Sequence, residues 1–179
     1  MGRVRTGQRG GTAAARRSLA VVQEADAVSA VDDALARQRR PCASDGSRRM
    51  RLGMHLCYGS SEDKHAIEPI DAQLLVDFMN GISARVTRSI DWMHFPAPIE
   101  RDDAAYFAPL KSLKIHPETE LYLGLVHMED GTAGAARRIK AAKAVLGKFG
   151  VAAECGLSST TLENYSATLD MHRKAAQLL

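Results

Sequence analysis

Residues 121–127 read Leu-Tyr-Leu-Gly-Leu-Val-His, and this run decides the fold that the sequence predicts. Its apolar side chains follow one another almost without interruption, which is typical of a strand buried on both faces in a parallel sheet. Three shorter strand-like runs occupy 51–58, 90–94 and 151–155. Helical patterns alternate with these runs, so residues 50–179 predict an α/β fold with a parallel sheet and covering helices.

Four helices are expected from the spacing of apolar residues, a proline in a first turn and capping residues. They are expected at about 69–86, 102–107, 131–150 and 160–177. Gly150 is the expected stop of the third helix, and Thr160 with Glu163 is a capping box for the fourth. The connection 95–117 holds four prolines and follows a strand end, where α/β folds place their functional sites.

The first 49 residues differ in composition from the rest of the chain. Residues 1–50 hold ten arginines, no lysine, five acidic residues and no aromatic residue, whereas the remainder holds fourteen basic and sixteen acidic residues. Such a segment has too little apolar surface to offset its ordering entropy, so residues 1–49 are predicted to be a disordered basic extension. Its arginines are typical of a transit peptide or a nucleic-acid-binding arm, and an incidental extension is the simpler interpretation.

The composition of the whole chain is that of an ordinary soluble domain. Its 179 residues are 45% hydrophobic and 25% charged, and no apolar run is long enough to span a membrane. The three cysteines are odd in number and widely spaced, unlike the framework of a secreted disulfide-rich protein. We therefore expect a cytoplasmic protein.

Histidine and cysteine gather at the predicted strand ends. His55 and Cys57 are two residues apart, so in a strand they point to the same face. Because parallel strands end at the same edge of a sheet, we expect His94, His127 and Cys155 to lie with them at that edge. Two sulfurs and two nitrogens suit tetrahedral zinc, so the sequence predicts a zinc site. The expected ligands are His55, Cys57, Cys155 and, as the fourth, His94; taken singly, each cysteine could instead be a plain buried hydrophobe.

Three segments carry a resemblance to a known family. The sequences MHLCYG at 54–59, IDWMHFP at 90–96 and VAAECG at 151–156 resemble the C-terminal catalytic barrel of cobalamin-independent methionine synthase and its shorter relatives. The resemblance implies a partial (β/α)8 barrel of about four C-terminal strand–helix units. It also implies zinc held at the positions of His55, Cys57 and Cys155, and methyl transfer from a methylated folate to a thiol such as homocysteine.

The sequence departs from that family at several positions. His94 stands where the family has a carboxylate ligand, and Gly59 stands where it has a further cysteine. The residues at the expected proton-transfer position are His127 and Glu129, which we take as the candidate catalytic pair. A complete barrel takes roughly 250 residues, so we expect this half-barrel to self-associate or to be completed by another polypeptide.

The remaining candidate residues are less specific. Tyr106 and His65 are candidate substrate-binding residues. Alternatively, Tyr106 only packs under the loop, and His65 lies in a solvated loop. The expected small-molecule partners are a thiol and a methyl donor. The alternative function is a non-catalytic truncated or divergent half-barrel that binds metal or packs on a partner. Nucleic-acid binding is disfavoured because residues 51–179 carry a net negative charge and no binding motif.

Overall fold

The computed structural model describes residues 51–58, 68–86, 88–155, 157 and 160–179, and it confirms the α/β class. Four parallel strands form one sheet in the order β1-β2-β3-β4. The strands are β1 (Gly53–His55), β2 (Trp92–Pro96), β3 (Glu120–Val126) and β4 (Gly150–Ala153). The helices are α2 (Gln73–Arg85), α3 (Ala104–Phe107), α4 (Gly131–Lys143) and α5 (Leu162–Ala176), with a 3-10 turn η1 (Ala108–Ser112) after α3.

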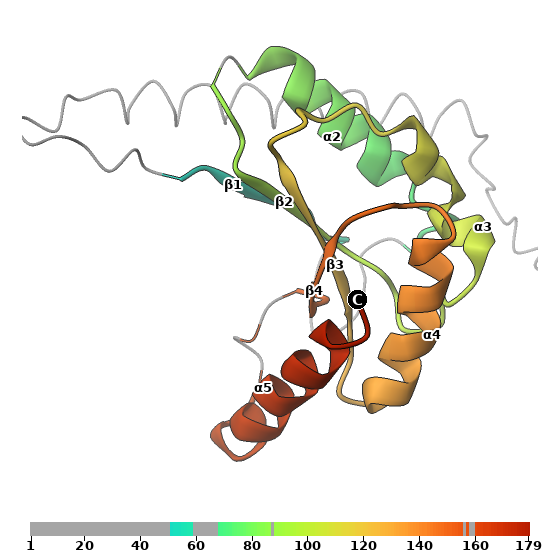
Figure 1. Ribbon diagram of the computed structural model, residues 1–179, viewed down its shortest axis with the longest axis vertical. Coiled ribbons are helices and arrows are strands. Elements are labelled where there is room, and N and C mark those ends of the chain that lie inside the picture. Colours follow the sequence, from blue (N-terminus) through green and yellow to red (C-terminus); the bar gives the residue numbers. More distant parts are fainter. Residues whose placement is uncertain (1–50, 59–67, 87, 156, 158–159) are drawn as a thin grey trace, which may run out of the picture. The chain divides into compact units, whose positions relative to one another are not determined.

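One face of the sheet packs into an apolar core. Figure 1 shows α2, α3 and α4 on one side of the sheet, with α5 beside β4. Alternate residues of β2 and β3 point towards these helices and are at most 7% exposed: Met93, Phe95, Leu121, Leu123 and Leu125. The facing side chains of α2 and α4 are equally buried: Leu75, Val76, Met79, Ile82, Ala135, Ile139 and Ala142. Burial of alternate strand positions against helices is what the period-2 pattern of a strand produces.

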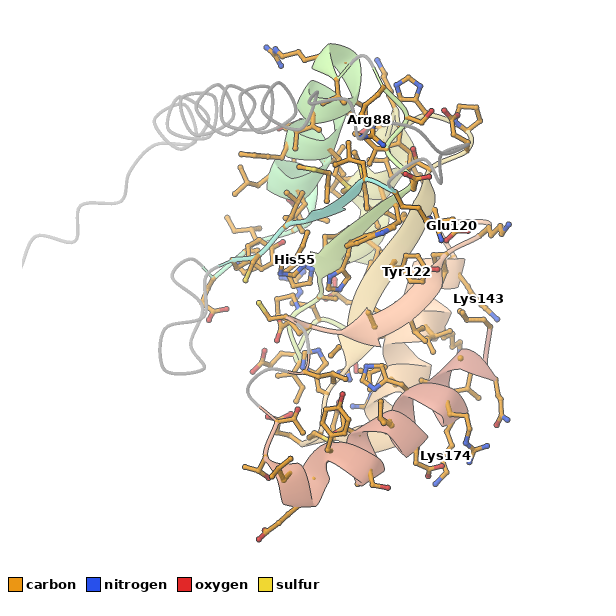
Figure 2. All side chains as sticks on the ribbon, turned by 90° about the vertical axis from the view of Figure 1, so that its left-hand side faces the viewer. His55, Arg88, Glu120, Tyr122, Lys143 and Lys174 are labelled. Carbon is orange, nitrogen blue, oxygen red and sulfur yellow. The ribbon has the colours of Figure 1, made fainter. Side chains whose placement is uncertain are left out.

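The other face of the sheet carries polar and aromatic side chains. Figure 2 looks onto this face, from which His55 and Tyr122 project. The register places His55, His94 and Tyr122 beside one another across β1, β2 and β3. Gly150 of β4 follows Tyr122 in the same row. A Cβ on Gly150 would lie 2.5 Å from the Tyr122 ring, so this ring extends over the neighbouring strand.

An open hollow of about 500 Å³ lies against this face. It extends from charged residues near the start of the strands to His94 in the middle of β2 and Ala153 at the end of β4. Its lining residues are Arg51, Trp92, His94, Glu120, Tyr122, Val151, Ala152, Ala153, Leu157 and His172.

A buried ion pair joins α4 to the ends of β2 and β3. Arg138 is fully buried, and its guanidinium donates two hydrogen bonds, of 2.7 and 2.8 Å, to the carboxylate of Asp130. The same guanidinium donates to the carbonyl of Leu125 at the end of β3 and to that of Ile99 after β2. The hydrogen bonds from Arg138 lower the pKa of the Asp130 carboxyl below its ordinary value. A buried charge with all these partners holds the loops that follow β2 and β3 in place.

Two of the expected helix boundaries are wrong: the first helix begins at Gln73 and not near Pro69, and the helix from Gly131 does not reach Gly150. The helix that begins at Gly131 ends at Lys143, and Gly150 starts β4. The amides of Val145 and Leu146 both bond to the Ala142 carbonyl, so the chain turns there instead of extending the helix.

The N-terminal caps of α5 and α3 differ. Thr161 is the N-cap of α5 and makes no side-chain cap hydrogen bond, so no capping box is formed from Thr160. By contrast, the side chain of Asp103 caps α3, accepting from the amide of Tyr106 at 2.9 Å. None of the described helices has the length and apolar character needed to cross a membrane. The predicted extension 1–49 lies outside the described residues.

Candidate metal centre

Three of the predicted ligands meet at the carboxyl ends of the two edge strands. His55 is the last residue of β1, Cys57 follows it by two positions, and Cys155 follows the end of β4 by two positions. The sulfurs of Cys57 and Cys155 are 2.8 Å apart, and the Cys155 sulfur is 3.6 Å from Nε2 of His55. The three ligand atoms lie within 4.8 Å of one another, so this group could hold a metal ion. The predicted convergence of these residues is therefore present.

The approach of the two edge strands depends on Gly124 in β3. The pairing of β3 with β4 is irregular between Gly124 and Val126. After this irregularity the chain passes close above Gly124: a Cβ there would lie 2.7 Å from Cα of Glu154 and 3.0 Å from the carbonyl oxygen of Ala153. The missing side chain lets the backbone of Glu154 lie against β3. Cys155 is consequently carried inwards, towards the end of β1.

The metal-free cluster favours a protonated Cys155 thiol. Partial burial, the hydrogen bond with Cys57 and the nearby charges of Cys57 and Glu154 raise the pKa of Cys155 to about 12. Burial also lowers the pKa of His55 below its ordinary value, so its imidazole is neutral at pH 7. A divalent cation among these groups would reverse the effect on Cys155, because it stabilises thiolates. Both cysteines are exposed, so an ion can reach them.

His94 lies directly against His55, outside this three-residue group. The Nδ1 atoms of the two imidazoles are 2.7 Å apart, and the ring planes differ by 20°. Nε2 of His94 is buried and has no hydrogen-bond partner among the described residues. Burial and the neighbouring His55 lower the pKa of His94 to about 4, against a smaller opposing effect of the Ala153 carbonyl. The role of His94 as fourth ligand stays a prediction.

His127 forms a second polar cluster with Glu154. The His127 ring is buried, and its Nε2 lies 2.8 Å from the carbonyl oxygen of Ala97. Because a carbonyl only accepts, Nε2 must donate, which leaves Nδ1 facing the Glu154 carboxylate at 3.6 Å. That contact is attractive only if one of the two facing groups carries a proton.

The carboxylate beside His127 is that of Glu154. Glu129, the other candidate catalytic residue, is exposed just before α4, and its catalytic role stays a prediction. Sequence reasoning overlooked Glu154 as a functional residue. Its place directly before Cys155, at the end of a predicted strand, was the available signal.

Tyr106 and Tyr58 anchor the loop that carries Cys57. Tyr106 is fully buried, and its hydroxyl donates to the carbonyl of Pro96 at 3.1 Å. The Tyr58 hydroxyl lies 2.9 Å from that of Tyr106 and therefore donates to it. Burial raises the pKa of both phenols above the ordinary value. The substrate-binding role of Tyr106 stays a prediction, and His65 lies outside the described residues.

Comparison with known proteins adds no relative: no family model, no curated protein and no solved structure matches the chain. The chemical interpretation of the site therefore depends on its own geometry. That geometry offers one imidazole nitrogen and two sulfurs at the surface, beside a buried histidine–carboxylate pair.

Proposed function

We propose that the chain is a zinc-dependent methyltransferase that acts on a thiol. One observation carries the proposal: His55, Cys57 and Cys155 come together from the two opposite edges of the sheet. One imidazole and two thiolates are a donor set that zinc prefers over magnesium or calcium, which take oxygen ligands. Structural zinc sites are usually closed by four protein ligands, whereas catalytic sites use three and keep one position for water or substrate. A three-ligand group at the surface matches the second type.

The proposed reaction uses the fourth position for the substrate. Zinc, when bound, would hold the sulfur of a thiol such as homocysteine as a thiolate near neutral pH. We assign to His127 and Glu154 the role of taking the proton that the thiol loses, with Glu129 the alternative carboxylate. The sulfur then forms a bond to the methyl carbon as the bond from that carbon to the donor nitrogen breaks, and the nitrogen takes up the proton that the thiol lost. A methylated folate is the donor that the sequence resemblance suggests.

We further propose that the sheet is half of a (β/α)8 barrel. Four consecutive parallel strands, with the candidate site at their carboxyl ends, are the arrangement found in such barrels. The sheet has two unpaired edges, β1 and β4, which closure of a barrel would pair. On α5 the side chains of Leu162, Tyr165 and Leu169 share one face and are 95%, 44% and 47% exposed. This apolar stripe favours association with a second copy or with a completing polypeptide.

Metal analysis of the purified full-length chain tests the proposal. We expect close to one zinc per chain, and a large loss of zinc in Cys57→Ser and in Cys155→Ser, because a hydroxyl is a poor substitute for thiolate on zinc. Cys42→Ser is the matched control and should retain the metal. A wild-type chain without metal, or an equal loss in Cys42→Ser, would contradict the zinc site.

Methyl transfer from a methylated folate to homocysteine is the assay for the reaction. Because we propose a half-barrel, the assay is run on the assembly that the chain forms in solution. A zinc-loaded assembly that transfers no methyl group to homocysteine or to other small thiols would favour the alternative function, a non-catalytic metal-binding half-barrel.

A further inference from the structure

The geometry points to His94 as a positioning residue that accepts a hydrogen bond from Nδ1–H of His55 and so leaves Nε2 of His55 free to bind the metal ion. This inference depends on the proposed metal site and assigns His94 a role other than that of fourth ligand.

The proton between the two rings decides whether His55 can bind a cation. A neutral imidazole carries one proton, on Nδ1 or on Nε2. The 2.7 Å separation of the Nδ1 atoms requires that one ring donates and the other accepts. If His94 donated, the proton of neutral His55 would be on Nε2, the nitrogen that faces the Cys155 sulfur at 3.6 Å. That nitrogen could then bind no ion. If His55 donates, its Nε2 lone pair points into the cluster.

The packing makes His94 the fixed member of this pair. His94 is 8% exposed in the middle of a row formed by β1, β2 and β3, whereas His55 is exposed and ends an edge strand of three residues. The ring planes differ by only 20°, and the 2.7 Å contact joins the two Nδ1 atoms. A buried imidazole therefore holds an exposed one in a single orientation and a single tautomer. Partners of this kind orient metal-binding histidines in many metalloproteins.

The same geometry argues against His94 as a fourth ligand. Its Nδ1 is engaged with His55, so ligation through that atom would break the hydrogen bond. Its Nε2 is buried and lies outside the group whose atoms are within 4.8 Å of one another. Either nitrogen could reach an ion in that group only after the ring had moved.

Zinc affinity of the full-length chain provides the first test. The dissociation constant is measured by competition with a chromophoric chelator for wild type, His94→Ala, His94→Gln and His116→Ala. We expect His94→Ala to bind one ion about 10–100-fold more weakly. His94→Gln should recover much of the affinity, since its amide oxygen can accept from His55. His116→Ala is the matched control, because His116 is exposed and distant from the cluster in the fold, and it should bind as wild type. Unchanged affinity in both His94 variants would overturn the inference.

Long-range proton–nitrogen NMR correlations of ¹⁵N-histidine-labelled protein provide the second test. We expect His55 to carry its proton on Nδ1 in the metal-free and zinc-loaded wild type, and to lose this preference in metal-free His94→Ala. A proton on Nε2 of His55 in the metal-free wild type would overturn the inference, as would a metal-bound nitrogen shift on His94. If the wild type binds no zinc, the proposed function fails, and the tautomer of metal-free His55 still decides this inference.

Discussion

Replacing Gly124 with alanine should weaken metal binding, although Gly124 contributes no ligand atom. The new Cβ would lie 2.7 Å from Cα of Glu154 and 3.0 and 3.1 Å from the carbonyl oxygens of Ala153 and Glu154. Carbon atoms in contact are about 3.5–4.0 Å apart, so the backbone of Glu154 must move by roughly 1 Å. All three contacts are with backbone, so no side-chain rotation can relieve them.

The displacement acts directly on a ligand, because Cys155 is the next residue. Ligand bonds to zinc are about 2.0–2.3 Å long, so a shift of roughly 1 Å is incompatible with an unchanged site. Overpacking of this kind costs about 1–3 kcal/mol. If the whole cost appears in metal binding, the affinity falls roughly 5- to 150-fold. If part of it appears in folding, the melting temperature falls by about 4 °C for each kcal/mol.

The assay compares Gly124→Ala with Gly147→Ala, a substitution of the same kind at a position where the new Cβ meets nothing within 4 Å. Zinc dissociation constants are measured by chelator competition, and melting temperatures are measured with excess chelator. We expect Gly147→Ala to match wild type in both. Wild-type affinity and stability in Gly124→Ala would refute the reasoning, because Cys155 would then reach the cluster without the close approach at Gly124.

Four further predictions concern stability and assembly. Arg138→Ala should lower the unfolding free energy in urea by about 3–5 kcal/mol, because it leaves the Asp130 carboxylate without its buried partner, whereas exposed Arg137→Ala should cost under about 1 kcal/mol. Since burial lowers the pKa of His94 to about 4 from 6.5, the unfolded chain binds a proton between these pH values that the folded chain does not. The unfolding free energy, measured with urea in the presence of chelator, should therefore fall by roughly 2–3 kcal/mol from pH 7 to pH 4.5 through this residue. A smaller fall in His94→Gln over the same pH range would identify His94 as the cause. Deletion of residues 1–46 should change the melting temperature by only about 2 °C, since so few apolar residues offer little burial; a fall of ten degrees or more would contradict this. Sedimentation at tens of micromolar should reveal self-association or aggregation through the open edges β1 and β4, and a stable monomer would contradict the half-barrel.

The local pattern of the sequence determined the elements and part of the site. Uninterrupted apolar runs predicted the strands, and the two-residue spacing of His55 and Cys57 placed both at one strand end. The position of Cys155 after another such run predicted that it would lie at the same edge of the sheet. These properties depend on neighbours within a few residues, which is why they can be read without a structure.

Only the tertiary structure decided which of these residues touch. The strand order, and the passage of the Glu154 backbone over Gly124, bring the two edge strands close enough for Cys57 and Cys155 to meet. The structure also set His94 against His55, and Glu154, not Glu129, against His127. Such contacts join positions 27 to 100 residues apart through sheet curvature and packing, and no local spacing encodes either of these.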